Sequence, residues 1–136
     1  MHIELTEKRV GTEYVMGKLN HDGCGAIVVF TGTVRPLESG NSINELHYEC
    51  YPEMAYKLIE DIVRSAMKKY GLNDAVVVHR YGDVPAGEAS VVVAASSGHR
   101  KEAFGGCSEI IDRIKAEVPI WKKDIGERTQ WQSERK

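Results

Sequence analysis

The sequence predicts one α+β domain, built from a mixed, largely antiparallel sheet and two long helices, and three observations support this prediction. The chain has 136 residues, of which 42% are hydrophobic and 28% charged, as is typical of a single domain over residues 1–136. Apolar residues recur at helical spacing over 52–70 and again before residue 118. Two β-branched runs are joined by the short segment 82–88, which favours an antiparallel hairpin over parallel crossovers.

The first expected elements are a short strand, a modest helix and a longer strand. Ile3 and Leu5 alternate with polar residues as in a strand, and residues 10–19 carry apolar side chains at helical spacing. Residues 26–30 form a continuously apolar, β-branched run, which is typical of a strand covered on both faces. We expect this strand to continue to Arg35.

The middle of the chain combines a loop, a strand and the most regular helix. Residues 36–42 concentrate Pro, Gly and Ser, so we expect a mobile connection there. Residues 43–51 alternate apolar and polar side chains, which predicts a strand with one covered face. The helix over 52–70 begins with proline and is followed by Gly71, and both residues are typical of helix boundaries.

Two further strands are expected over 75–81 and 89–96, because both segments are apolar and rich in valine. The segment 82–88 between them contains glycine, aspartate and proline, which are typical turn residues. We therefore expect a long hairpin loop between the two strands.

The C-terminal part is predicted to contain the second long helix and a last strand. The helix begins near residues 97–100 and ends before Pro119, because proline cannot continue a helix. Residues 120–125 are predicted to form a strand. The tail over 126–136 is polar, and we expect it to be mobile.

Charge and composition exclude several classes of function. Lysine and arginine number 18 against 20 aspartate and glutamate, a formal net charge of −2, so no overall positive field attracts nucleic acid or an anionic membrane. No apolar run approaches the roughly 20 residues of a membrane span, and the first residues lack the order of a secretory signal. We therefore expect a cytoplasmic protein that binds neither nucleic acid nor membrane.

The cysteines show no pattern of a disulfide framework or a metal site. Cys24, Cys50 and Cys107 form no C-x-x-C pair. His47 and Cys50 lie three positions apart in an expected strand, and therefore on opposite faces. We expect no metal ion and interpret the cysteines as reduced thiols in strands or apolar helix faces.

The sequence SSGHR over residues 96–100 is a candidate anion site. It joins an expected buried strand to a long helix, whose first N–H groups face whatever lies beyond the strand. Arg100 adds donors that match phosphate or carboxylate, and His99 can exchange a proton near neutral pH. An equally open interpretation is that Ser97 caps the helix and that the two basic residues are solvated.

Four more basic residues are considered for a site. Lys115 follows Arg100 by about 22 Å along the expected helix, so the two cannot contact one small group. Lys122 and Lys123 should point to opposite faces of a strand, so that one can face a pocket. Arg35 ends a buried strand. The alternatives are a structural lysine at 115, solvated lysines and a surface arginine beside a turn.

Five segments of the chain form a recognisable series, in this order: FTGTVR at 30–35, LHYECYPEMA at 46–55, HRYG at 79–82, SSGHRKEAF at 96–104 and PIWKKD at 119–124. In sequence and order they resemble the MoaE family, the large catalytic subunits of molybdopterin synthase. The resemblance implies an α/β-hammerhead-like fold and a sulfurtransferase without a cofactor. Such an enzyme converts cyclic pyranopterin monophosphate to molybdopterin in molybdenum cofactor biosynthesis.

The resemblance also implies partners and site residues. The sulfur donor is a small ubiquitin-like subunit whose C-terminal Gly-Gly ends in a thiocarboxylate, and a central homodimer binds two of them to form a heterotetramer. The family's catalytic lysines fall on Lys115 and Lys122. Its substrate-binding residues fall on Arg35, His99, Arg100 and, across the dimer, Arg135.

Two alternatives to this function remain. A persulfide on one of the cysteines is a competing route for sulfur, although a thiocarboxylate donor makes an enzyme thiol unnecessary. A noncatalytic module that binds a phosphorylated pterin or the tail of a partner is the alternative from a different class of function.

Overall fold

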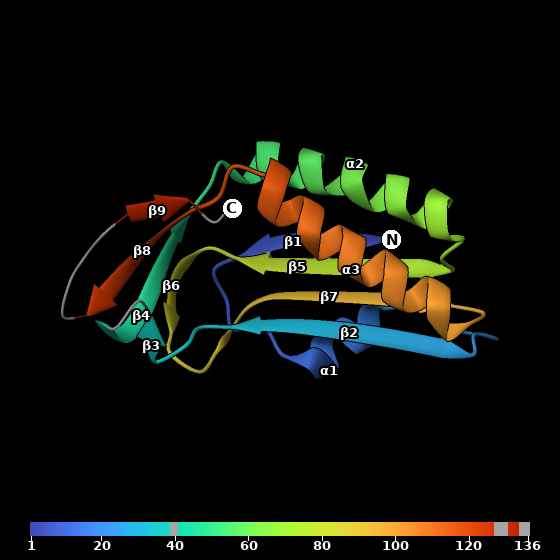
Figure 1. Ribbon diagram of the computed structural model, residues 1–136, viewed down its shortest axis with the longest axis horizontal. Coiled ribbons are helices and arrows are strands. Elements are labelled where there is room, and N and C mark those ends of the chain that lie inside the picture. The colour runs from blue at the N-terminus through green and yellow to red at the C-terminus, as the bar shows by residue number, and fades with distance from the viewer. Residues whose placement is uncertain (39–40, 127–130, 134–136) are drawn as a thin grey trace.

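The fold is α+β, as the sequence predicts, and the computed structural model describes residues 1–38, 41–126 and 131–133 (Figure 1). The helices of this part are α1 (Thr12–Lys18), α2 (Pro52–Tyr70) and α3 (Arg100–Glu117). Its strands are β1 (His2–Thr6), β2 (Ala26–Thr33), β3 (Leu37–Glu38), β4 (Asn41–Glu49), β5 (Asp74–Arg80), β6 (Gly82–Pro85), β7 (Ala89–Ser97), β8 (Trp121–Gly126) and β9 (Trp131–Ser133). In these residues no helix is long and apolar enough to cross a membrane.

The first sheet has the strand order β1-β5-β7-β2. β1 and β5 are parallel, whereas β7 is antiparallel to both of its neighbours, so the sheet is mixed and largely antiparallel. Every residue of β5 is buried. α2 and α3 cover one face of the sheet and α1 lies on the other (Figure 1). The central strands are therefore covered on both faces, which explains their valine-rich composition.

The prediction that residues 26–30 are covered on both faces is wrong. β2 pairs only with β7 among the described strands, and so lies at the edge of the sheet. Ile27 and Phe30 are 38% and 36% exposed. The strand also ends at Thr33 rather than at Arg35. A register shift between Gly32 and Thr33 disrupts its pairing with β7 there. Position in the sheet, which local composition does not encode, decides this exposure.

The second sheet lies beyond one end of the first and has β4 at its centre (Figure 1). β4 is antiparallel to β3, β6 and β8, and β8 pairs with β9. Two segments that we predicted as loops, 36–42 and 82–88, thus contribute β3, the start of β4 and β6. Within the tail that we expected to be mobile, residues 131–133 form β9, which pairs with β8. Residues 39–40, 127–130 and 134–136 lie outside the described part.

α2 and α3 approach each other closely because α3 has two glycines where α2 ends. A Cβ atom on Gly105 would lie 2.6 Å from Cε1 of Tyr70, and one on Gly106 would lie 2.7 Å from Cδ1 of Leu72. Larger residues at these two positions would collide with their neighbours. These two adjacent glycines therefore allow close packing of the helix against its neighbours, and they do not interrupt the helix.

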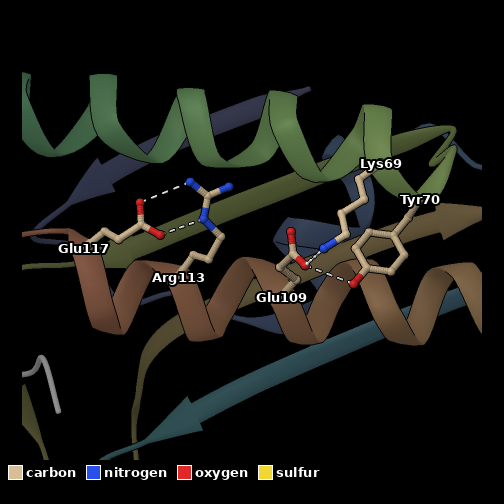
Figure 2. Close-up of polar contacts among 5 residues, drawn as sticks. All are labelled: Lys69, Tyr70, Glu109, Arg113 and Glu117. Carbon is tan, nitrogen blue, oxygen red and sulfur yellow. Dashed lines mark hydrogen bonds and ion pairs between the residues drawn. The ribbon is translucent and has the colours of Figure 1, made fainter.

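Polar contacts accompany this packing (Figure 2). Glu109 accepts hydrogen bonds from Nζ of Lys69 at 2.7 Å and from the hydroxyl of Tyr70 at 3.0 Å. Arg113 donates to both carboxylate oxygens of Glu117, at 2.6 and 3.1 Å. The hydrogen bond from Lys69 holds the pKa of Glu109 below its ordinary value. These charges on α3 are paired at the surface.

Candidate active site

A small cavity lies where the two sheets meet the C-terminal end of α3. Its volume is about 160 Å³. Three cationic side chains line it, and they come from three separate segments of the chain: Arg35, Lys115 and Lys122. Tyr48 of β4 and Ser90 of β7 form part of the wall. The structure therefore brings together three of the residues that the sequence singles out.

Lys115 reaches this cavity from the last turn of α3. The residues around it on the helix, Ile111 and Ile114, are buried, and Val118 directly after the helix is buried as well. Lys115 itself is half-buried at the border of this apolar face. A lysine in the last turn also interacts favourably with the helix dipole. The apolar residues thus fix where the ammonium group of Lys115 can lie.

Lys122 reaches the cavity from β8. The register of β4 and β8 places Lys122 opposite Tyr48 and Lys123 opposite His47. Because successive residues of a strand point to opposite faces, Lys122 shares the face of the buried Tyr48, and Lys123 lies on the other face. This is the arrangement that we predicted for two adjacent lysines, and Lys122 is the one that lines the cavity.

Arg35 reaches the cavity from the segment that leaves β2. Val34 before it is buried and held by two backbone hydrogen bonds, from its own N–H to the carbonyl of Glu88 and from Gly87 to its carbonyl. Ser90 donates a hydrogen bond to the carbonyl of Gly32 at 3.3 Å, at the register shift between β2 and β7. Such bulges redirect a strand and the side chains that follow it.

His99 and Arg100 do not line this cavity. Both are exposed at the N-terminal end of α3, about 22 Å from Lys115 along the helix axis. That end lies beside the start of β2, where a Cβ atom on Gly25 would be 2.5 Å from the carbonyl oxygen of Gly98. A single chain therefore does not bring all five basic residues to one pocket. Arg135 lies outside the described residues.

The alternative interpretation, in which Ser97 caps the helix, is wrong. His99 is the N-cap residue of α3, and no side chain caps the helix there. Ser97 instead ends β7 and is buried. The first N–H groups of α3 therefore lack the side-chain acceptor that we considered as the alternative to an anion site.

An apolar surface separates the two basic regions. Phe104 of α3 is 61% exposed, and the exposed Ile27 and Phe30 lie on the edge strand β2. α3 packs against β2, and Phe30 points to this face of the sheet together with Val28, which packs against the core under α2 and α3. Ile27 points to the opposite face together with Val29, which packs against the core under α1. Exposed apolar side chains at an edge strand are typical of an interaction surface.

Two residues of the site region were not singled out by the sequence analysis. Tyr48 lines the cavity although it is only 4% exposed. Its ring lies edge-on to the ring of the buried His79, with the centroids 5.9 Å apart. The alternation of Leu46 and Tyr48 with polar residues along β4 predicts a covered strand face, but it does not indicate a cavity.

The cysteines lie outside this cavity. Burial raises the pKa of the Cys107 thiol to about 11, so this thiol is protonated at neutral pH. Cys24 and Cys50 are only partly buried and lie outside the strands, which corrects our interpretation that all three cysteines lie in strands or apolar helix faces. No cluster of three or more possible metal ligands occurs in the described part of the chain.

The family model described as "MoaE protein" matches residues 5–117. The molybdopterin synthase catalytic subunit of Thermoplasma volcanium is 46% identical over 124 residues, which are 91% of this chain and 90% of that protein. The crystal structure of molybdopterin synthase from Staphylococcus aureus superposes with a TM-score of 0.89 at 36% identity, over 95% of each chain.

A protein–protein complex of subunits 1 and 2 of molybdopterin-converting factor from Helicobacter pylori also contains a similar chain. It superposes with a TM-score of 0.75 at 25% identity and covers 98% of this chain and 91% of that one. The α+β architecture predicted from the sequence is thus the architecture of these proteins.

Proposed function

We propose a sulfurtransferase function for this chain, which belongs to the MoaE protein family. In this proposal it acts in molybdenum cofactor biosynthesis in the cytoplasm and converts cyclic pyranopterin monophosphate to molybdopterin. The two dithiolene sulfurs come from the C-terminal thiocarboxylate of a small ubiquitin-like subunit. The Thermoplasma volcanium relative is named as a molybdopterin synthase catalytic subunit, which supports this proposal.

The cavity with Arg35, Lys115 and Lys122 is the observation that supports this proposal. The pterin substrate carries a cyclic phosphate, and the donor tail ends in an anion. Three cations from separate segments concentrate positive charge locally although the net charge of the chain is −2. Such a site attracts both reactants and stabilises negative charge as it develops during the reaction.

The positions of the two lysines favour different roles. Lys115 is fixed by the apolar end of α3, and in our proposal it binds and orients the thiocarboxylate. Lys122 lies on a strand directly opposite Tyr48, and we assign it proton transfer or charge stabilisation as sulfur attacks the side chain of the pterin. Arg35 binds an anionic group of the substrate.

In our proposal, His99 and Arg100 of a second copy of the chain contribute to the same active site. A cavity of about 160 Å³ is smaller than the several hundred Å³ typical of a ligand pocket, so it accommodates only part of the pterin substrate. The second anion site lies at the other end of α3. One substrate can contact both regions if two chains pack with their α3 helices antiparallel.

The apolar surface of Phe104 and Phe30 supports this homodimer. It lies between the two basic regions, and a twofold axis through it would place the N-terminal end of one α3 near the C-terminal end of the other. Burial of these side chains would also cover the open edge of β2. One small subunit on each chain then completes a heterotetramer, and the Helicobacter pylori complex of two subunits supports that partner.

Product formation from purified components tests the proposal. The chain is incubated with cyclic pyranopterin monophosphate and the thiocarboxylated small subunit, and the ordinary carboxylate form of that subunit is the control. We expect molybdopterin only with the thiocarboxylate. Substrate binding without product from either form would contradict the sulfurtransferase and favour a noncatalytic binding module.

A further inference from the structure

We infer that Tyr48 is a further functional residue of the cavity, whose hydroxyl orients the acyl end of the partner's C-terminal tail, and that His79 positions its ring. The inference rests on the proposed function and extends it to two residues that are not basic. Two observations support it: Tyr48 lies among the cationic residues of the cavity, and its ring is held by contacts with His79.

Tyr48 lies among the cationic residues of the cavity. The strand register places it directly opposite Lys122, and cross-strand neighbours have Cβ atoms about 5 Å apart. It lines the same cavity as Arg35 and Lys115. At 4% exposure the side chain is otherwise covered, so its accessible atoms belong to a buried wall and not to an open surface.

The ring of Tyr48 packs against the buried ring of His79. The rings of Tyr48 and His79 meet edge to face, with 5.9 Å between centroids and an interplanar angle of 73°. His79 is only 1% exposed. Its Nδ1 lies 2.9 Å from the carbonyl oxygen of Arg80, and because a carbonyl only accepts, Nδ1 carries the proton. This hydrogen bond fixes the imidazole against which Tyr48 packs.

Arg80, the residue after His79, is held by further hydrogen bonds. Arg80 is buried and donates to Oε1 of Glu88 at 2.8 Å and to the carbonyl of Asp83 at 3.3 Å. The strand end that carries His79 is thereby tied to β6 and to the turn before β7. Tyr48 consequently packs against a rigid support, which is the condition for a well-positioned functional group.

A lysine ammonium group and a tyrosine hydroxyl differ in how strongly they orient a bound group. An ammonium group is a compact charge on a flexible stem and attracts an anion without fixing its orientation strongly. A phenol donates one hydrogen bond in one direction and adds no charge. In a cavity that already holds three cations, the Tyr48 hydroxyl therefore contributes orientation of the acyl oxygen, so that the sulfur faces the pterin.

The variant Tyr48→Phe tests the hydroxyl and keeps the ring. We expect kcat of the assembled enzyme to fall about tenfold, while KM for each substrate stays within threefold of the wild-type value. Tyr70→Phe is the matched control, because its phenol binds Glu109 on the outside of α3. A fall in kcat of less than threefold, or a higher KM with unchanged kcat, would overturn the inference.

A double-mutant cycle tests whether His79 acts through Tyr48. If it does, His79→Leu lowers kcat in the wild-type background, and the double variant with Tyr48→Phe is no slower than the slower of the two single variants. Additive losses would show an independent role of His79 and overturn its assignment. If His79→Leu fails to fold, the Tyr48→Phe comparison decides the inference alone.

The two proposals fail in different ways. If the wild-type chain forms no molybdopterin, the sulfurtransferase function is wrong. If the wild-type chain is active and Tyr48→Phe is equally active, the function stands and the role of Tyr48 is wrong. Thermal unfolding of Tyr48→Phe, expected within about 3 °C of the wild type, separates loss of orientation from loss of fold.

Discussion

The two ends of α3 carry the same kind of charge in different surroundings. At the N-terminal end, His99 and Arg100 are exposed beside the start of β2. At the C-terminal end, Lys115 is half-buried and shares a cavity with Arg35 and Lys122. The 18 residues of the helix separate the two regions by more than 20 Å, about four turns. A helix of this length divides the basic residues of our proposed site into two halves.

A second contrast lies within the last turns of α3. Arg113 donates two hydrogen bonds to Glu117 on the outside of the helix (Figure 2), whereas Lys115, two residues later, lines the cavity. Residues two apart on a helix do not share a face. Charged residues on the outer face of α3 therefore form ion pairs at the surface, whereas Lys115 on another face lines the cavity.

The largest expected effect separates these two residues. Lys115→Ala should lower the rate of molybdopterin formation by at least about 100-fold with the fold intact, because it removes a cation from the cavity. Arg113→Ala, the matched control, should leave the rate within twofold and change stability by less than about 1 kcal/mol. Steady-state kinetics and thermal unfolding of both variants measure this, and full activity of Lys115→Ala would remove it from the site.

The second largest effect is on stability and arises in the middle of α3, where close packing and not charge determines the contact with the neighbouring residues. Gly106→Ala should lower the free energy of unfolding by about 1–3 kcal/mol, because its Cβ would lie 2.7 Å from the Leu72 side chain. Activity per folded molecule should not change.

Gly17→Ala in α1 is the control for this packing effect, because nothing lies within 4 Å of its Cβ. It should raise stability by about 0.5 kcal/mol. Urea unfolding measures both variants, and equal effects of the two substitutions would refute close packing at Gly106.

A smaller effect concerns pH and the contact between α2 and α3. The hydrogen bond from Lys69 lowers the pKa of Glu109, so its stabilising contribution is complete above the ordinary pKa and is lost as the pH falls through the lowered one. Glu109→Gln should therefore reduce stability at neutral pH, and its difference from the wild type should shrink towards low pH. A constant difference between pH 7 and 3 in urea unfolding would contradict this.

The smallest expected effect is on the cysteines. Replacing Cys24 and Cys50 with Ser and Cys107 with Ala should leave the rate of sulfur transfer per folded molecule within twofold, because in our proposal the sulfur arrives as a thiocarboxylate. The same assay measures it, after the folded fraction is determined by circular dichroism. A loss of more than tenfold in a folded variant would favour a persulfide route.

Local signals explain what the sequence could predict. α2 begins and ends at the predicted residues, because Pro52 and Gly71 mark its boundaries and Gly71 adopts φ of +64°. The opposite faces of Lys122 and Lys123 follow from the geometry of any strand. The distance between Arg100 and Lys115 follows from the rise of any helix. These features depend on neighbouring residues only.

Pairing between distant segments explains what the sequence could not predict. β6 forms only because β4 supplies a partner, and residues 82–85 alone have the composition of a turn. The exposure of Phe30 depends on the position of β2 at the sheet edge. The contact of Tyr48 with His79 joins two strands of different sheets. Motif resemblance named the basic residues, but it did not indicate that they form two separate groups within one chain.

Mixing two inactive variants tests most directly whether the two ends of α3 form one site. Lys115→Ala and Arg100→Ala are each expected to be inactive alone, and are unfolded and refolded together so that mixed dimers form. Half of the dimers are then mixed, and each holds one site with both native residues, so the account predicts recovery of about a quarter of the wild-type activity. No recovery in dimers shown to be mixed would contradict a site that is shared between two chains.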